Sequence, residues 1–445
     1  MKLPSKQLLI LTSIIAVMVV AGSSGLFWYQ QKLSKLPLGA VISYKTVEES
    51  DLYVCFAMEA YDKIKDNYWD KIKDENLSEL FHLALAKTAN VSADTITLSS
   101  KDRAGTAKML AASVVGMKDD KAKKELVLNT LVVTLYNLAP AGRDSILSSR
   151  EETALRENVS NIDRSKDLYQ DLGLVKGADK AVVEKAFEEK RTALEKDKSP
   201  EAVTKLKAVT YAHEVLTQDD TKARYDQNQI EPTVFTQIIG RTFYVGISKI
   251  SPTTLDELGK ALTSAVSNQK LDSLIIDLRG NVGGALEFAQ YFLGLFLGQN
   301  QYAFDFYHQG DFQVQRTMMP KLEGLKIFKD IAVLTDDMTQ STAELMTASL
   351  KHFNLAYVVG TRTRGWGTIE NTFPLETVID PNEKYSLLLV HSVTLRDDGQ
   401  SIEGLGVDPD IDITKPDWKT KLSQFFHSPS IIKVLSDIAT KPPLR

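Results

Sequence analysis

The 445-residue sequence is poor in cysteine and histidine, with one Cys and six His. A lone Cys55 cannot form an internal disulfide or a thiolate metal cluster, and the histidines show no His-x-x-x-His spacing. Neither sign of charge dominates, because 53 basic residues stand against 58 acidic ones, a formal net charge of −5. No strongly basic segment is available to neutralise a phosphate backbone. We therefore expect no metal, no cofactor and no nucleic-acid partner.

Long hydrophobic runs are also scarce, and the one run that could cross a bilayer is residues 8–29. Its 22 residues would span ~33 Å as a helix. The most apolar part, 8–21, also has the length of a cleaved signal peptide. Trp28 and Tyr29, which end the run, favour an uncleaved anchor. We expect a single-pass cell-membrane protein with the bulk of the chain extracytoplasmic, and both interpretations export that bulk.

The rest of the chain has the composition of a globular protein, with 43% hydrophobic and 25% charged residues overall. Apolar residues recur at helical spacing over 48–157, and 166–227 is a charged helical block. After Pro232 strand and helix signals alternate, which predicts a mixed α/β layer. The strands are expected at 242–247, 273–278, 331–334 and 356–359, and the helices at 253–268, 286–297 and 341–352. The predicted parts are an anchor (1–35), a helical arm (36–160), a helical module (166–228), the α/β core (233–414) and a helical tail (415–445).

Three segments of the core could carry chemistry. In 274–284, Leu-Ile-Ile-Asp-Leu-Arg-Gly-Asn-Val-Gly-Gly, a strand runs into a glycine-rich turn whose N–H groups could approach an oxyanion. A tight strand-to-helix turn would explain the same glycines. In 339–344, Ser341 and Glu344 fit a capping box at the start of a helix. In 358–370, a glycine-spaced loop separates two strands, for which a bulged hairpin is the simplest local interpretation.

Together and in this order, the three segments resemble the core of the C-terminal processing (tail-specific) serine peptidases. The resemblance covers about 233–413 and includes the closing segment 398–411, Asp-Gly-Gln-Ser-Ile-Glu-Gly-Leu-Gly-Val-Asp-Pro-Asp-Ile. It implies a ClpP/crotonase-like α/β core and a Ser/Lys dyad, in which a neutral lysine takes the proton of the serine hydroxyl. The nucleophile position falls on Ser341. The implied oxyanion donors are the backbone amides of Gly283 or Gly284 and of Thr342.

The sequence departs from the family at the base. The lysine is expected between Gly365 and Gly367, where this chain has Trp366, and the orienting Gln four positions later is Glu370. An indole N–H only donates, so it cannot accept the serine proton. His352 would lie ~16 Å along the same helix, while Lys351, His308 and the carboxylates of Glu344 and Glu370 stay open as substitutes.

We therefore expect a peptide-binding pseudopeptidase whose partner is an unfolded or extended polypeptide, captured by addition to a strand edge. The alternative is an active serine endopeptidase that trims or degrades exported proteins with a non-standard base. Val282, where the family has proline, costs backbone rigidity without excluding either function.

The block 166–228 occupies the position in which the family usually carries a PDZ domain, and it resembles a DnaJ-type J domain. Helices are expected at 181–194 and 203–216. The His-Pro-Asp loop through which J domains stimulate the seventy-kilodalton heat-shock chaperones is Glu195-Lys196-Asp197 here. Such a chaperone is therefore not an expected partner, and we interpret the block as a structural or docking module.

Overall fold

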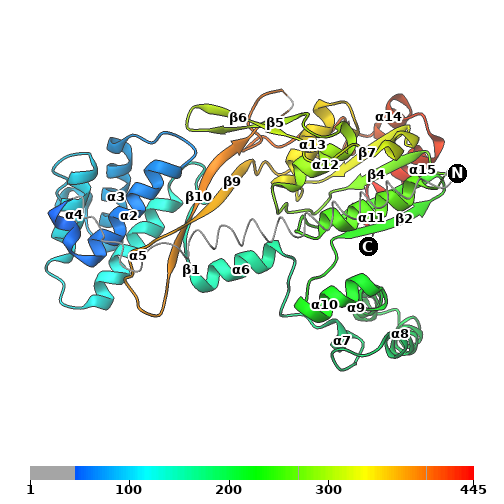
Figure 1. Cartoon of the computed structure of the whole chain (residues 1–445), viewed down its shortest axis with the longest axis horizontal. Coiled ribbons are helices and arrows are strands. Elements are labelled where there is room, and N and C mark those ends of the chain that lie inside the picture. Colours follow the sequence, from blue (N-terminus) through cyan, green and yellow to red (C-terminus); the bar gives the residue numbers. More distant parts are fainter. Residues whose placement is uncertain (1–45, 269, 397, 445) are drawn as a thin grey trace.

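The computed structural model describes residues 46–268, 270–396 and 398–444 (Figure 1). The apolar run 8–29, and with it the predicted anchor, lies outside the described residues. No helix in the described part of the chain combines the length and hydrophobicity that a membrane crossing requires.

The amino-terminal part of the described chain is a helical arm, as predicted from its periodicity. Its helices are α2 (Leu52–Asn67), α3 (Asp74–Ala89), α4 (Arg103–Val114), α5 (Asp120–Tyr136) and α6 (Ser149–Val159). Asp51 caps α2 by accepting hydrogen bonds from the amides of Tyr53 and Val54. The apolar faces of α2, α3 and α5 pack around Phe56, Tyr61 and Phe81 and bury Leu387 and Leu389 from a strand far along the chain. The arm is thus tied to the rest of the molecule by its core.

That strand is β10 (Tyr385–Thr394), the centre of a five-stranded antiparallel sheet. It pairs with β1 (Ser145–Ser148), β9 (Thr368–Pro374) and β5 (Tyr302–His308), and β5 pairs with β6 (Asp311–Arg316). A bulge interrupts the β9–β10 ladder between Val390 and Ser392. In Figure 1 the long strands β9 and β10 run from the arm toward the carboxy-terminal core.

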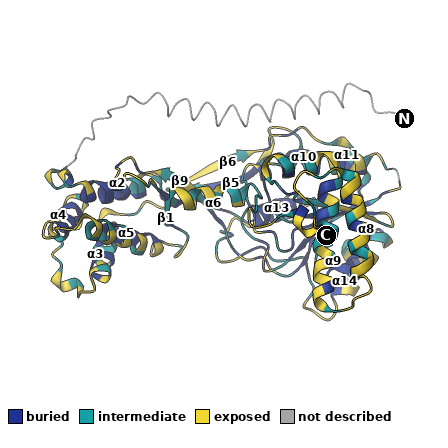
Figure 2. Ribbon diagram, turned by 90° about the horizontal axis from the view of Figure 1, so that it is seen from below, coloured by how far each residue is buried: buried dark blue, intermediate teal, exposed yellow. Residues whose placement is uncertain are grey.

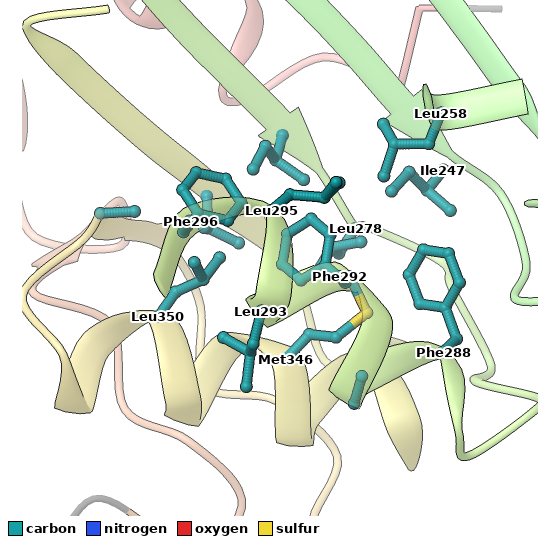
Figure 3. Close-up of a cluster of buried hydrophobic side chains, with 14 of the residues drawn as sticks. Ile247, Leu258, Leu278, Phe288, Phe292, Leu293, Leu295, Phe296, Met346 and Leu350 are labelled. Atoms are coloured by element: carbon teal, nitrogen blue, oxygen red, sulfur yellow. The ribbon is translucent and has the colours of Figure 1, made fainter. Parts of the chain in front are cut away.

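The core is a six-stranded sheet with the order β11-β8-β7-β4-β3-β2, parallel except for β2. Its strands are β2 (Val234–Ile239), β3 (Thr242–Ile247), β4 (Ser273–Asp277), β7 (Asp330–Thr335), β8 (Tyr357–Gly360) and β11 (Ile411–Asp412). Helices α11 (Thr254–Val266), α12 (Phe288–Leu297) and α13 (Thr342–His352) cover one face, where Phe292 and Met346 meet (Figure 3). Helices α14 (Trp418–Phe425) and α15 (Pro429–Ile438) cover the other. The predicted mixed α/β class is confirmed.

A small helical module lies between the arm and the core in sequence. It comprises α7 (Leu168–Asp171), α8 (Lys180–Leu194), α9 (Pro200–Thr217) and α10 (Asp219–Asn228). Tyr169, Phe187, Val209 and Tyr225 form its own buried cluster. Figure 2 shows exposed outer faces on α8 and α9, as expected for amphipathic helices in a small bundle.

The local interpretation of 358–370 as a bulged hairpin is wrong, because its two strands do not pair with each other. Strand β8 belongs to the six-stranded sheet and β9 to the five-stranded one, so the intervening loop crosses between sheets. The loop is held by close backbone contacts with 402–406, since a Cβ on Gly367 would lie 2.2 Å from the Glu403 nitrogen. Strand β1, in a region predicted to be helical, and strands β2, β5, β6, β10 and β11 were not predicted, whereas β9 begins in the second strand expected within 358–370.

Candidate active site

Ser341 stands immediately before α13, in a backbone conformation that is unusual for a residue with a side chain. Its φ is 57° and its ψ −127°. This region favours glycine, and a side chain held there costs of order 1–3 kcal/mol. Such strain persists only where the surroundings fix it, and it concentrates at functional sites. The geometry therefore marks Ser341 beyond the role of an ordinary helix cap.

The glycine-rich turn after β4 lies directly against Ser341. A Cβ on Gly283 would be 2.7 Å from the Ser341 Cβ, so only glycine permits this approach. The Gly283 N–H donates to Asn281 Oδ1 at 2.8 Å, and Asn281 Nδ2 donates to the Ile247 carbonyl at 2.8 Å. The turn is thereby fastened to β3.

Two backbone amides remain as candidates for stabilising an oxyanion. Within the described residues, the N–H groups of Gly284 and Thr342 have no hydrogen-bond acceptor, whereas that of Gly283 is engaged by Asn281. Thr342 is the first residue of α13, where helix amides are unsatisfied and favour negative charge. Of the three donors that the family resemblance implies, Gly284 and Thr342 therefore fit the role better than Gly283.

The buried carboxylate of Glu344 joins Ser341 to the loop that carries Trp366. It accepts hydrogen bonds from the Ser341 N–H at 2.9 Å and the Trp366 N–H at 2.7 Å. The Gly365 N–H, at 2.7 Å, and the Thr363 hydroxyl, at 2.5 Å, donate to its other oxygen. Burial raises the pKa of Glu344 above its usual range. Its predicted contact with Ser341 is present, and its contacts with the 363–366 loop were missed.

Trp366, which the family resemblance aligns with the base, has its indole engaged on two sides. Nε1 donates to Glu370 Oε1 at 3.1 Å, and the Thr368 hydroxyl donates to the same oxygen at 2.5 Å. The guanidinium carbon of Arg143 lies 3.4 Å from the ring centroid, a cation–π contact. Trp366 thus serves as a donor and a stacking platform and offers no proton acceptor.

Arg143 and Asp144, which immediately precede β1, are site neighbours that sequence reasoning missed. Arg143 Nη2 lies 2.7 Å from Glu403 Oε1, and the other Glu403 oxygen accepts from the Gly367 N–H at 2.9 Å. Asp144 Oδ1 accepts from the Val390 N–H at 2.7 Å, while its buried Oδ2 has no hydrogen-bond partner among the described residues. Burial, with the nearby Glu370 charge, raises the pKa of Asp144 to about 7. No local motif marks these two residues, because their partners Trp366, Val390 and Glu403 lie more than two hundred positions further along the sequence.

Of the substitutes for a base that the sequence left open, Lys351 and His308 are engaged elsewhere, whereas the carboxylates of Glu344 and Glu370 accept hydrogen bonds within the site. Lys351 pairs with Asp410 at 3.2 Å and donates to the Asp408 carbonyl at 2.8 Å. His308 stacks on His391 with ring centroids 4.1 Å apart, and His352 lies edge-on to an aromatic ring at the end of α13. Across the described ranges, no side chain makes a hydrogen bond to the Ser341 hydroxyl.

Part of the glycine-turn motif has a structural role. Asp277 and Arg279 form a buried ion pair at 2.6 Å, and the Tyr244 hydroxyl donates to Asp277 at 2.7 Å. Arg279 also donates to the carbonyls of Ile438 and Ala439 at the end of α15. These residues anchor the carboxy-terminal helices to the sheet rather than touching the Ser341 region. Among the described residues no group of three His, Cys, Asp or Glu could hold a metal ion.

Comparison with known proteins identifies sequence relatives of the carboxy-terminal core. Residues 241–413 match Peptidase family S41. A "Probable CtpA-like serine protease" of Staphylococcus aureus (strain N315) is 27% identical over 181 residues, 41% of this chain and 35% of the relative. Its counterpart in Staphylococcus epidermidis is 25% identical over the same length and shares. The matches therefore span about a third of the length of these relatives.

Among solved structures, the "Photosystem II D1 C-terminal processing protease" aligns with a TM-score of 0.47 and 13% identity, covering 83% of this chain and 94% of that one. A lipoprotein from Streptococcus agalactiae aligns with a TM-score of 0.39 and 16% identity, covering 78% of this chain and 96% of that one.

Proposed function

Since the chain belongs, through residues 241–413, to the C-terminal processing serine peptidases of family S41, we propose that it binds extended polypeptide at the Ser341 site without efficient hydrolysis. The observation that carries the proposal is the state of Trp366. Its N–H donates to Glu370 and its ring lies beneath Arg143, so the position of the base holds a donor. Without an adjacent acceptor, a serine hydroxyl is a weak nucleophile at neutral pH.

The remainder of the site supports peptide binding. The amides of Gly284 and Thr342 can donate to a carbonyl oxygen of a bound chain as they would to an oxyanion. Glu344 fixes the Ser341 backbone and the Trp366 loop in one arrangement, which lowers the ordering cost of binding. Polypeptide is the substrate class of the family, and here it becomes the proposed ligand.

The test uses the purified full-length chain and fluorescein-labelled casein, an unfolded polypeptide. We expect saturable binding by fluorescence anisotropy and a cleavage rate that is the same for the wild type and Ser341→Ala. Cleavage that Ser341→Ala abolishes would overturn the proposal.

The second candidate function is an active endopeptidase with a non-standard base, and the strained Ser341 backbone favours it. An inert serine has no need of a φ of 57°, whereas a nucleophile is commonly held in such a conformation. Reaction with a fluorophosphonate probe separates the two functions, because it requires an activated hydroxyl. Labelling of the wild type but not of Ser341→Ala would favour the active enzyme.

The cellular setting belongs to the same proposal. We place the chain at the cell membrane, anchored through residues 8–29, with the core, arm and module outside the cytoplasm. The module 166–228, with its J-domain resemblance and lacking a His-Pro-Asp loop, is assigned a docking role. Alkaline extraction of membranes tests the anchor, and digestion of intact cells with an external protease tests the orientation. Release by alkali, or full protection from the protease, would contradict this placement.

A further inference from the structure

Strand β2 is the free edge of the six-stranded sheet. It pairs only with β3 among the described strands, and Thr236, Gln237 and Ile238 are exposed. The Ser248 N–H donates to the Thr233 carbonyl, so Thr233 and Ser248 form a hydrogen-bonded pair. In an antiparallel ladder hydrogen-bonded and non-hydrogen-bonded pairs alternate, and Val234 opposite Ile247 is therefore a non-hydrogen-bonded pair. The backbone groups of Thr236 and Ile238 therefore point away from β3. An edge with unpaired N–H and C=O groups can receive another strand.

This edge lies in a groove between the core and the helical module. The cavity has a volume of about 650 Å³ and is lined by β2, α9, α10 and α11. Arg224 of α10 forms ion pairs with Asp256 and Glu257 of α11, the latter at 3.0 Å. The Tyr211 ring of α9 lies 6.2 Å from the Phe235 ring of β2. These contacts hold the module beside the strand and leave the groove open along it.

The charge of the groove indicates what it would receive. Its lining includes the acidic side chains Glu214, Asp220, Asp256 and Glu257 against the basic Arg224 and Lys260. Arg224 is already paired with two of the carboxylates, and Lys260 pairs with Asp220 and, at 3.1 Å, with Asp256. Glu214 is exposed at the groove and forms no ion pair within the described chain, and partial desolvation raises its pKa. The groove is net negative, and Glu214 is available to pair with a basic side chain of a ligand.

We propose that this groove is a second polypeptide-binding site, in which an extended segment carrying a basic side chain adds as a strand to the edge of β2. Main-chain hydrogen bonds to Thr236 and Ile238 would supply affinity, and Glu214 would select for Lys or Arg. The inference extends the proposed function, because it concerns polypeptide capture, but it uses no residue of the Ser341 site. The helical module then has a defined role, since it forms the outer wall of the groove.

The probe is the fluorescein-labelled peptide Thr-Lys-Thr-Val-Thr-Lys-Thr-Val, titrated by anisotropy against the full-length chain. Thr236→Pro removes the edge N–H, and proline is tolerated at such an edge position. We expect at least tenfold weaker binding for Thr236→Pro and unchanged binding for Thr236→Val, which keeps the amide. Glu214→Gln should reduce the preference for this peptide over its Glu-for-Lys analogue several-fold. Equal binding by Thr236→Pro and the wild type would overturn the proposal.

A control on the peptide side removes any dependence on variant folding. Two versions of the peptide carry N-methyl groups on alternate residues, so that each version blocks the N–H groups along one edge of the strand. Strand addition requires that one version loses at least tenfold in affinity while the other binds like the parent. Equal affinities for both would contradict strand addition.

Amide hydrogen exchange separates this inference from the proposed function. Protection by the peptide at 234–239 supports the β2 site, even if the Ser341 site remains unprotected and the proposed function fails. Protection confined to Gly284 and Thr342 would overturn the β2 site while supporting the proposed function.

Discussion

Around position 366, the neighbouring charges determine whether a lysine placed there could act as a base. In Trp366→Lys the amine would lie near the Glu370 carboxylate, which the indole N–H now contacts at 3.1 Å. A carboxylate keeps an amine protonated, whereas the Gln that the family resemblance implies would not. We expect Trp366→Lys alone to cleave casein no faster than Ser341→Ala. Trp366→Lys/Glu370→Gln should be faster by about tenfold or more, since about one pKa unit separates the two environments.

The matched control is the same double variant with Ser341→Ala, which must abolish the gain. Equal rates for the single and double variants would show that the Glu370 charge does not limit the engineered base.

Asp144 predicts a pH dependence of stability. Its pKa is about 7 in the folded protein, against an ordinary value of 3.8 for an exposed aspartate, so the folded state binds the proton more tightly. The stabilisation of the folded state by this proton is fully present below about pH 4 and is lost as pH rises through about 7. Asp144→Asn keeps an acceptor for the Val390 N–H and carries no charge. In urea denaturation, we expect the free energy of unfolding of Asp144→Asn, relative to that of the wild type, to rise by ~2–4 kcal/mol from pH 5 to pH 8. An equal pH dependence in both proteins would contradict it.

At the scale of elements, the positive φ of Ser341 before α13 is a local backbone strain whose energy substitutions can measure. Ser341→Gly relieves the positive φ, and Ser341→Ala does not. We expect Ser341→Gly to be more stable than Ser341→Ala by ~1 kcal/mol or more in chemical denaturation, despite the poorer helix-capping ability of glycine. Ser349→Gly, in the interior of the same helix, is the control and should destabilise by about 0.5 kcal/mol, because glycine has the lower helix propensity. If Ser341→Gly were the less stable of the two, the strain would have to be stored elsewhere.

Sequence reasoning succeeded for elements whose signal is local. The parallel strands and their helices carry apolar periodicity, so β3, β4, β7 and α11 to α13 were predicted within a few residues. The local bond from Glu344 to the Ser341 amide was predicted from the capping-box spacing. Sequence reasoning missed three features: the hydrogen bonds from the 363–366 loop to Glu344, the crossing of 361–367 between the sheets, and the stacking of Arg143 on Trp366. These contacts join segments far apart in sequence, and no short-range pattern encodes them.

At the scale of the whole molecule, the position of the helical module depends on Arg224. The guanidinium pairs with Asp256 and Glu257 across the gap to α11, and Glu257 also accepts from the amides of Thr233 and Val234. Arg224→Ala would remove the cation shared by these two carboxylates at a partly buried contact and leave Asp256 with Lys260 alone. The expected loss is about 1–3 kcal/mol from the docking of the module. The cluster around Tyr169 and Tyr225 is internal to the module, so its helices should stay folded.

We therefore expect Arg224→Ala to release the module as a folded unit. Small-angle scattering should give a larger radius of gyration, and trypsin should cut faster after Arg164 and Lys166 in the connecting segment 160–167. Far-ultraviolet circular dichroism should be unchanged. Arg191→Ala is the matched control, because Arg191 pairs within α8, with Glu188 at 2.5 Å, and its loss should move none of these signals. High salt should shift the wild type part of the way toward Arg224→Ala, since these pairs are partly screened. If Arg224→Ala kept the radius of gyration and trypsin pattern of the wild type, the Tyr211–Phe235 contact would be sufficient to hold the groove wall in place.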